Sequence, residues 1–318
     1  MKTLAIIAEY NPFHNGHLYH LNKAKEITEA SHTVALISGN FLQRGIPAMW
    51  NKYTRGRMCT SSGIDLALEL PFPYATGSAK DFATGAINIL DKLNSIDFLC
   101  FGAECDDINL LTKIADVINQ EPDSYKEQLT TGLASGLSYP KARTMALNEY
   151  FISENINITD IINKPNNILA MEYIAALRRI RSRIKPIIIK RHNAMYHDNV
   201  LYGSISSASA IRTQIESTEF NINNIKHDIP EQVNNIIAND YMVNWPITCD
   251  DLTPFLQSKL LNPINFNEVC DISEDLANKL YKLHPVTNYQ DTLNALSSKD
   301  LTTTRICRSL IHLIMNYK

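Results

Sequence analysis

Five short apolar segments punctuate the first two thirds of the chain. Between most of them, apolar residues recur three or four positions apart, as in residues 18–24 and 83–90, which is the spacing of an amphipathic helix. Strands that alternate with helices predict a parallel sheet covered on both faces, a Rossmann-like α/β fold. Ligands of such sheets bind at the carboxyl ends of the strands, where the strand order reverses. The predicted strands are residues 3–8, 33–38, 65–70, 97–102 and 186–191.

The pattern changes after about residue 215. Residues 216–246 are rich in asparagine, isoleucine and acidic residues, and their interleaved isoleucines favour a helix over disorder. Further on, residues 273–283 and 302–315 have the pattern of amphipathic helices with Ser or Thr near their starts. We therefore expect a catalytic domain over residues 1–215 and a smaller helical domain over residues 216–318.

Composition narrows the class of protein. With 45% hydrophobic and 20% charged residues in 318, the chain resembles an ordinary globular protein, and its net charge of −3 gives no overall attraction to nucleic acid. The six cysteines are scattered, and no two have the two-residue gap of a zinc ribbon, so reduced thiols are expected. No apolar run is long enough for a signal peptide or a membrane span. The sequence predicts a cytoplasmic protein with no membrane and no DNA partner.

Three histidines crowd the segment "EYNPFHNGHLYH", residues 9–20, directly after the first predicted strand. At this strand-to-helix junction the helix start is expected to present free backbone N–H groups and a positive dipole end, which suit a phosphate. Gly16 lets a ligand approach the backbone, and Asn11-Pro12 stiffens the entry. His14 and His17, three apart, project to one side and are placed to donate to phosphate oxygens as charge builds up. A zinc site, which lacks a third ligand nearby, and incidental surface histidines are the alternatives.

A second candidate segment is "SISSASAIR", residues 204–212. It places small hydroxyl residues at a predicted helix start, with Arg212 one turn in. The hydroxyls of Ser206, Ser207 and Ser209 are candidate donors or N-caps, and Arg212 is a candidate to neutralise pyrophosphate. An ordinary Ser-capped helix is the alternative.

The pattern His14-x-Gly16-His17 after a first strand, joined to the Ser-rich segment, resembles the nucleotidyltransferase superfamily marked by an H-x-G-H motif. Several longer blocks narrow the resemblance to the family of tRNA(Met) cytidine acetate ligases. Nearly all of residues 1–215 carry it, and it continues more weakly to residues 302–315. The blocks are "EYNPFHNGHLYHL", "SGNFLQRGIPAMWNKYTR", "GIDLALELPFPYATGSAKDFATGAINIL", "FGAE", "PNNILAMEYIAAL", "KRHNAMYHD" and "SSASAIR".

This resemblance implies a nucleotidyltransferase-type Rossmann domain plus a helical domain, and a two-step reaction. ATP, with Mg²⁺, and acetate would give acetyl-adenylate and pyrophosphate. The acetyl group would then pass to N4 of the wobble cytidine in elongator tRNA(Met). The family's chains are expected to continue beyond the point where this sequence stops. Two other readings stay open: an adenylyltransferase acting on a small phosphorylated acceptor, and a tRNA-binding protein without catalysis.

The resemblance also implies site residues. His14, His17 and Arg212 would be catalytic. The roles of Asp65 and Glu69 are open: Asp65 either orients a histidine or a metal-bound water, or caps local structure. No metal ligand is assigned. The ATP-binding residues would be Ile7, Ala8, Glu9, Tyr10, Asn11, Pro12, Phe13, His14, Asn15, Gly16, His17, Leu18, Tyr19, His20, Gly102, Asn166, Arg191, His192 and Ser206.

Two groups of basic residues are candidates for binding RNA phosphates. Arg305 and Arg308 share one face of the last predicted helix. The other group is a dense cluster, for which a solvated helix end is the alternative. It comprises Arg178, Arg179, Arg181, Arg183, Lys185, Lys190 and Arg191.

Overall fold

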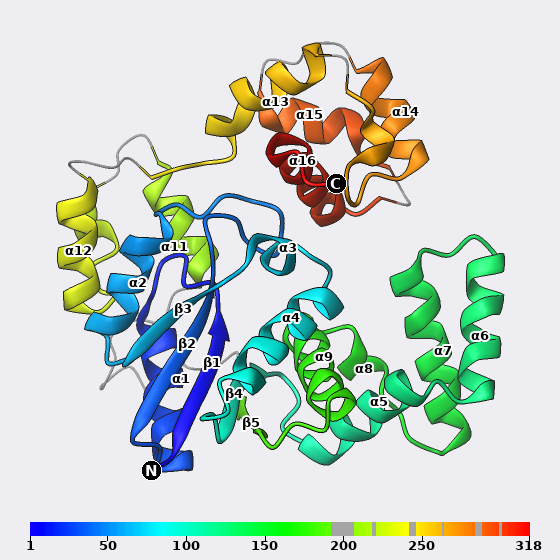
Figure 1. Ribbon diagram of the computed structural model, residues 1–318, viewed down its shortest axis with the longest axis horizontal. Coiled ribbons are helices and arrows are strands. Elements are labelled where there is room, and N and C mark those ends of the chain that lie inside the picture. The colour runs from blue at the N-terminus through cyan, green and yellow to red at the C-terminus, as the bar shows by residue number, and fades with distance from the viewer. Residues whose placement is uncertain (192–206, 218–220, 242–245, 263, 284–287, 299–300) are drawn as a thin grey trace.

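A five-stranded parallel sheet forms the centre of the amino-terminal part (Figure 1). The computed structural model describes residues 1–191, 207–217, 221–241, 246–262, 264–283, 288–298 and 301–318. The strand order is β3-β2-β1-β4-β5, so it reverses between β1 and β4, and all five predicted strands are confirmed to within one residue at each end. The strands are β1 (Thr3–Ala8), β2 (His32–Ser38), β3 (Leu66–Leu70), β4 (Phe98–Ala103) and β5 (Lys185–Lys190).

Helices cover both faces of the sheet, as expected. On one face, α1, α2 and α12 pack on one side of β1 and β2, and on the other face α4, α5 and α9 bury the opposite side chains of the same strands. Each face has its own apolar core because successive strand residues point to opposite sides. The helices are α1 (Asn15–Thr28), α2 (Lys52–Ser61), α4 (Ala79–Lys92), α5 (Ile108–Gln120), α9 (Pro165–Arg179) and α12 (Glu231–Tyr241).

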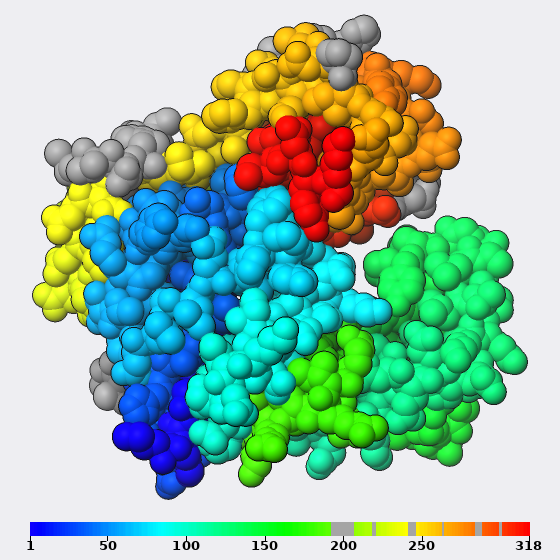
Figure 2. Space-filling model, viewed as in Figure 1, coloured from blue at the N-terminus to red at the C-terminus, as the bar shows by residue number. Residues whose placement is uncertain are grey.

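Between β4 and β5 the chain adds a helical hairpin that the sequence reading did not predict. It consists of α6 (Asp123–Ala134) and α7 (Tyr139–Ser153), followed by the short α8 (Thr159–Ile162). The two helices pack closely, since a Cβ on Gly132 would lie 2.9 Å from the Cβ of Ala142. Figure 2 shows the hairpin standing apart from the carboxyl-terminal helices, with a hollow between the two.

The carboxyl-terminal helices enclose a third apolar core. Ser273 and Thr302 cap α14 and α16, which confirms both predicted amphipathic helices and their start signals. Helix α16 rests on α3 (Phe72–Ala75) and the residue after it, because His312 Nε2 lies 2.9 Å from the Thr76 hydroxyl. The other elements are η3 (Asp250–Leu252), α13 (Thr253–Leu261), η4 (Phe266–Glu268), α14 (Glu274–Lys282), α15 (Tyr289–Leu296) and α16 (Thr303–Met315).

The division near residue 215 stays a prediction, and the packing favours a later boundary. Beyond α11 (Ala208–Ile215) and η2 (Ile222–Asn224), helix α12 buries Val233 and Ile237 in the same core as α1 and α2. An ion pair of 2.6 Å between Arg57 Nη2 and the Asp240 carboxylate ties α12 to α2. The segment up to α12 therefore packs as part of the sheet unit.

Candidate active site

The start of helix α1 is capped by two histidines. His14 is the N-cap, and its Nδ1 accepts the Gly16 amide at 3.0 Å. His17 Nδ1 accepts the His14 amide at 3.2 Å, which completes a reciprocal capping box with imidazoles in place of the usual hydroxyl and carboxylate. The two rings stack with centroids 3.6 Å apart. The motif therefore fixes both ring orientations through the backbone.

This cap also fixes the proton positions on both rings. A backbone N–H can only donate, so each Nδ1 that accepts one must be unprotonated, and the neutral ring then carries its hydrogen on Nε2. Burial lowers the pKa of His14 to about 4, with the Arg191 charge adding to the effect, and burial lowers the pKa of His17 well below its usual value. At neutral pH both histidines are therefore neutral Nε2–H donors, and their role toward phosphate stays a prediction.

The backbone amides at this helix start are already hydrogen-bonded. The Asn15 amide donates to the Asp228 carbonyl at 2.9 Å, and the Asn15 side chain donates to the His227 carbonyl at 2.8 Å. The amides of Gly16 and His17 bond to the His14 side chain and carbonyl, respectively. The expectation of free amides for a phosphate is therefore not met in this conformation.

Arg212 reaches the loop that follows β1 from far along the chain. Its helix, α11, begins after Ser207, whose hydroxyl accepts the Ala210 amide at 3.1 Å, so the predicted Ser-capped helix start is confirmed. Arg212 Nη1 donates to the Asn11 carbonyl at 3.0 Å, and its Nη2 donates to the Ser209 hydroxyl at 3.2 Å. Burial lowers the Arg212 pKa, and the nearby Glu9 carboxylate opposes that shift.

The structure brings Gly102, Asn166 and Arg191 together at the ends of β4 and β5. A Cβ on Gly102 would lie 3.1 Å from the Arg191 side chain, and Arg191 Nη1 donates to Asn166 Oδ1 at 3.1 Å. Glu104, which the sequence reading quoted only within "FGAE", accepts the Asn166 Nδ2 hydrogen at 2.6 Å and the Asn167 amide at 3.0 Å. These contacts fix the orientation of the Asn166 amide. His192 and Ser206 lie outside the described residues.

A buried arginine that the sequence reading missed holds the neighbouring strand ends. Arg55 is 0% exposed and donates to the main-chain carbonyls of Glu9 at 2.6 Å, Ser38 at 2.9 Å and Trp50 at 3.1 Å, and also to that of Gly39. Burial lowers its pKa to about 10, so it stays charged at neutral pH. Arg55 fixes the carboxyl ends of β1 and β2 and places a positive charge beneath them.

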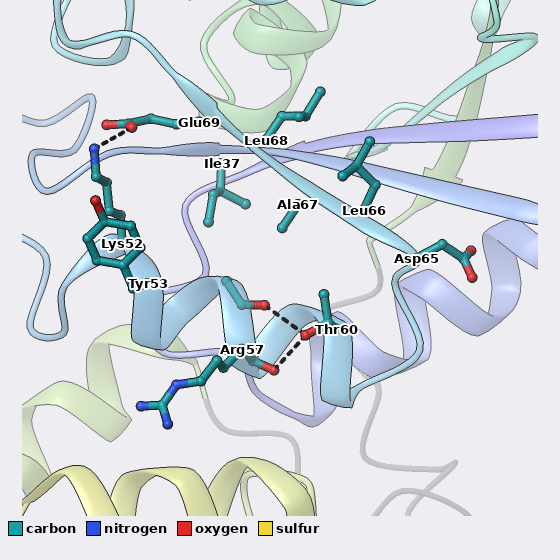
Figure 3. A pocket seen from close by; sticks show the side chains of 11 residues that line it. Ile37, Lys52, Tyr53, Arg57, Thr60, Asp65, Leu66, Ala67, Leu68 and Glu69 are labelled. Atoms are coloured by element: carbon teal, nitrogen blue, oxygen red, sulfur yellow. Dashed lines mark hydrogen bonds and ion pairs between the residues drawn. The ribbon is translucent and has the colours of Figure 1, made fainter.

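Asp65 and Glu69 lie along the edge strand instead. Asp65 accepts the Thr33 amide at 2.7 Å and the Thr33 hydroxyl at 2.8 Å, so it caps the start of the β2–β3 pair. Glu69 pairs with Lys52 at 2.5 Å. Both line an open groove of about 560 Å³ between α2 and β3, into which Ile37 and Ala67 point from the sheet (Figure 3). The capping role left open for Asp65 is the one observed.

The seven clustered basic residues do not form one patch. Arg178 pairs with Asp116, while Lys190 pairs with Asp106 at 2.8 Å. Strand β5 separates the two ends of the cluster, so Lys185 lies at the amino edge of the sheet, roughly 17 Å from the carboxyl edge. Of the seven, Arg191 is the one whose charge acts on His14, His17 and His20.

In α16, the two predicted phosphate-binding residues, Arg305 and Arg308, differ in their surroundings. The Arg308 side chain is 12% exposed and donates to Asp271 at 3.1 Å. Arg305 lies half-buried in the first turn of α16. Arg308 is therefore poorly placed to reach an RNA phosphate.

Comparison with known proteins decides the family. The whole chain, residues 1–318, matches the family described as HIGH Nucleotidyl Transferase. A tRNA(Met) cytidine acetate ligase of Thermoanaerobacter pseudethanolicus is 41% identical over 318 residues, covering 99% of this chain and 78% of that protein. One of Clostridium tetani is 38% identical over 317 residues, with 98% and 78% coverage. The chain belongs to the tRNA(Met) cytidine acetate ligase family.

Solved structures support the same assignment. TmcAL of Thermotoga maritima bound with alpha-thio ATP has a TM-score of 0.91 and 33% identity, covering all of this chain and 75% of that one. The ligand-free form has a TM-score of 0.92 and 34% identity, with 100% and 76% coverage. The predicted family and its nucleotidyltransferase fold are confirmed. Within the described ranges, no helix is long and apolar enough to cross a membrane.

Proposed function

We propose that this protein activates acetate with ATP and transfers the acetyl group to N4 of the wobble cytidine of elongator tRNA(Met). The observation that carries the proposal is the convergence of His14, His17 and Arg212 on the loop after β1, beside the switch in strand order. The relatives' name, tRNA(Met) cytidine acetate ligase, and the alpha-thio ATP held by the Thermotoga maritima protein supply the substrates. The reaction is proposed for the cytoplasm, with an RNA and no DNA substrate.

The chemistry requires an activated acyl donor. Acetate is an inert carboxylate, and the exocyclic amine of cytidine is a poor nucleophile. Attack of an acetate oxygen on the α-phosphorus forms acetyl-adenylate and releases pyrophosphate. Attack of N4 on the acetyl carbonyl then forms the amide and releases AMP with a proton.

The described side chains supply donors for the first step. The two Nε2–H groups are proposed to bind α-phosphate oxygens, where charge builds up in the transition state. Being neutral, they add no charge that would repel Arg212 or Arg191. Arg212 is proposed to bind the pyrophosphate as it leaves. Gly102, Asn166 and Arg191 are proposed to bind the adenosine.

Magnesium would accompany the triphosphate. No group of three His, Cys, Asp or Glu side chains suited to a metal ion occurs in the described part of the chain. Mg²⁺ in nucleotide sites is commonly held by substrate phosphates, with several waters and only one or two carboxylates. We therefore propose that Mg²⁺ binds with ATP, mainly through the phosphates.

The test is ATP–pyrophosphate exchange with a panel of small carboxylic acids, followed by nucleoside analysis of tRNA incubated with the full reaction. Acetate should stimulate exchange most strongly, and N4-acetylcytidine should form in elongator tRNA(Met) only when acetate and ATP are both present. If acetate does not stimulate exchange, the ligase proposal is wrong, and an adenylyltransferase with a phosphorylated acceptor takes its place.

The surface that binds tRNA is assigned to the helical residues after the sheet unit. Because Arg308 is paired, Arg305 is the better candidate of the two. Loss of a phosphate contact should make the dependence of log affinity on log salt shallower by about one unit. An unchanged slope in Arg305→Ala would exclude Arg305 as a phosphate contact.

A further inference from the structure

A tight turn in the loop between β2 and α2 touches the nucleotide loop. The Leu42 amide donates to the Ile46 carbonyl at 2.9 Å, and the Gly45 amide donates to the Leu42 carbonyl at 2.8 Å, which closes the turn. At its tip, the Gln43 amide donates to Glu9 Oε1 at 3.0 Å. The tip therefore lies against the first residue after β1.

On the side away from Glu9, the turn packs against the backbone of α16 at Gly45. Gly45 has a φ of +73°, and a Cβ there would lie 2.2 Å from the Arg308 backbone nitrogen and 2.4 Å from the Cys307 carbonyl carbon. Leu42 is 1% exposed. Contact on both sides fixes where the tip points.

The tip carries an exposed cation. Among the described residues, none forms a hydrogen bond or ion pair with the Arg44 guanidinium, which is exposed, whereas Gln43 before it is half-buried and Gly45 after it is buried. Arg212 donates to the Asn11 carbonyl at 3.0 Å, and the turn that carries Arg44 contacts Glu9, so both arginines adjoin the loop after β1. Burial raises the pKa of Glu9 and lowers that of Arg212, and the Arg44 charge acts to lower the pKa of each.

The side chains of Arg44 and Arg212 carry two positive charges beside this loop, against the one carboxylate of Glu9. The buried Arg55, which donates to the Glu9 carbonyl, adds a further positive charge. Like charges held close by separate elements repel, and an anion between them removes the repulsion. Guanidinium groups bind phosphate oxygens with short, charge-assisted hydrogen bonds. The two arginines beside this loop therefore suit a multiply charged anion such as a triphosphate.

We propose that Arg44 is a further ATP-binding residue, which binds the β and γ phosphates opposite Arg212 and holds pyrophosphate as it forms. This assignment rests on the proposed function, since it takes ATP as the nucleotide. Because the adenosine is assigned to the ends of β4 and β5, Arg44 should contribute to binding of ATP and not of AMP.

Calorimetric titration of ATP and AMP into wild type, Arg44→Ala and Arg44→Lys tests this. Arg44→Ala should raise the Kd for ATP about 10- to 100-fold, the range expected for a hydrogen bond to a charged group, and leave the Kd for AMP within about twofold. Arg44→Lys should restore part of the ATP affinity, since lysine keeps the positive charge but lacks the paired N–H donors of the guanidinium. Lys126→Ala, which removes an exposed cation from α6, controls for net charge.

The outcomes separate the two proposals. If wild type binds neither nucleotide, the proposed function fails. If wild type binds ATP and Arg44→Ala leaves the ratio of the two Kd values unchanged, Arg44 does not bind the β and γ phosphates and acts only on the loop. An equal loss for ATP and AMP overturns the assignment in the same way.

Discussion

Replacement of His17 by asparagine, glutamine or alanine separates the two roles that the structure gives this imidazole. Its Nδ1 accepts the His14 amide at 3.2 Å, and its Nε2–H is left for the ligand. Asparagine places an oxygen near the position of Nδ1 and nothing at Nε2. Glutamine places an amide near the position of Nε2, and glutamine at this helix position also supports a capping box. Alanine removes both groups.

The sizes of the two effects differ enough to be measured apart. Loss of a helix cap costs about 0.5–2 kcal/mol of stability. Loss of one donor that acts on charge in the transition state costs about 100- to 1000-fold in turnover, or about 2.7–4 kcal/mol of barrier. Alanine should therefore lose stability and rate, asparagine should lose rate alone, and glutamine should recover part of the rate. ATP affinity should change much less than turnover in all three.

The assays are denaturant unfolding and acetate-dependent ATP–pyrophosphate exchange on the same preparations. Exchange at the wild-type rate in a folded His17→Asn protein would refute the catalytic assignment, because that variant has no donor at Nε2. Rates that fall only as stability falls across the series would reduce His17 to a helix cap. Glutamine as inactive as alanine would argue that a neutral donor is not what the reaction uses.

Three further predictions follow from single contacts. Glu104→Gln should weaken ATP binding about 10-fold, because its amide cannot accept from both Asn166 and the Asn167 amide; an unchanged calorimetric Kd would contradict this. Burial lowers the pKa of His14 to about 4, below its unfolded value of about 6.5, so the unfolded chain binds more protons between these pH values. The free energy of unfolding should therefore fall by up to about 3 kcal/mol as the pH drops from about 6.5 to about 4. Denaturant unfolding across this range should show a steeper loss for wild type than for His14→Asn. Gly45→Ala should lower the free energy of unfolding by about 1–3 kcal/mol, because its Cβ would meet the α16 backbone, and a thermal melt like that of wild type would mean that the turn is not seated on α16.

The strands were predictable because their signal is local. Each is a short apolar run bounded by polar residues, and burial on both faces of a parallel sheet selects such runs without help from distant residues. The helix starts at Ser207, Ser273 and Thr302 were predictable for the same reason, since a cap involves only neighbouring residues. The α6–α7 hairpin gave no comparable signal.

The site was predictable only in part, because much of it joins residues far apart in the chain. The histidine motif marked the helix start. Nothing in the neighbouring sequence indicates that the carbonyls of residues 227 and 228 accept hydrogen bonds from the Asn15 side chain and amide. Arg55 resembles any helical arginine in the sequence, although it is buried on four carbonyls. The basic cluster looked continuous because its members are close in sequence, although an extended strand, β5, separates its two ends in space.

The turn over residues 42–46 connects the two parts of the molecule at the point where the chemistry is proposed. One side of it holds the Glu9 carboxylate through the Gln43 amide, and the other lies on the backbone of α16 with no room for a Cβ at Gly45. A contact between two backbones can adjust less than one made by a long side chain, because close-packed interiors are barely compressible and transmit strain. A shift of α16 against the sheet unit must therefore move the tip that carries Arg44 or open a gap behind it. The helices proposed to bind RNA and the residue proposed to bind pyrophosphate are thus joined by direct contact through Gly45.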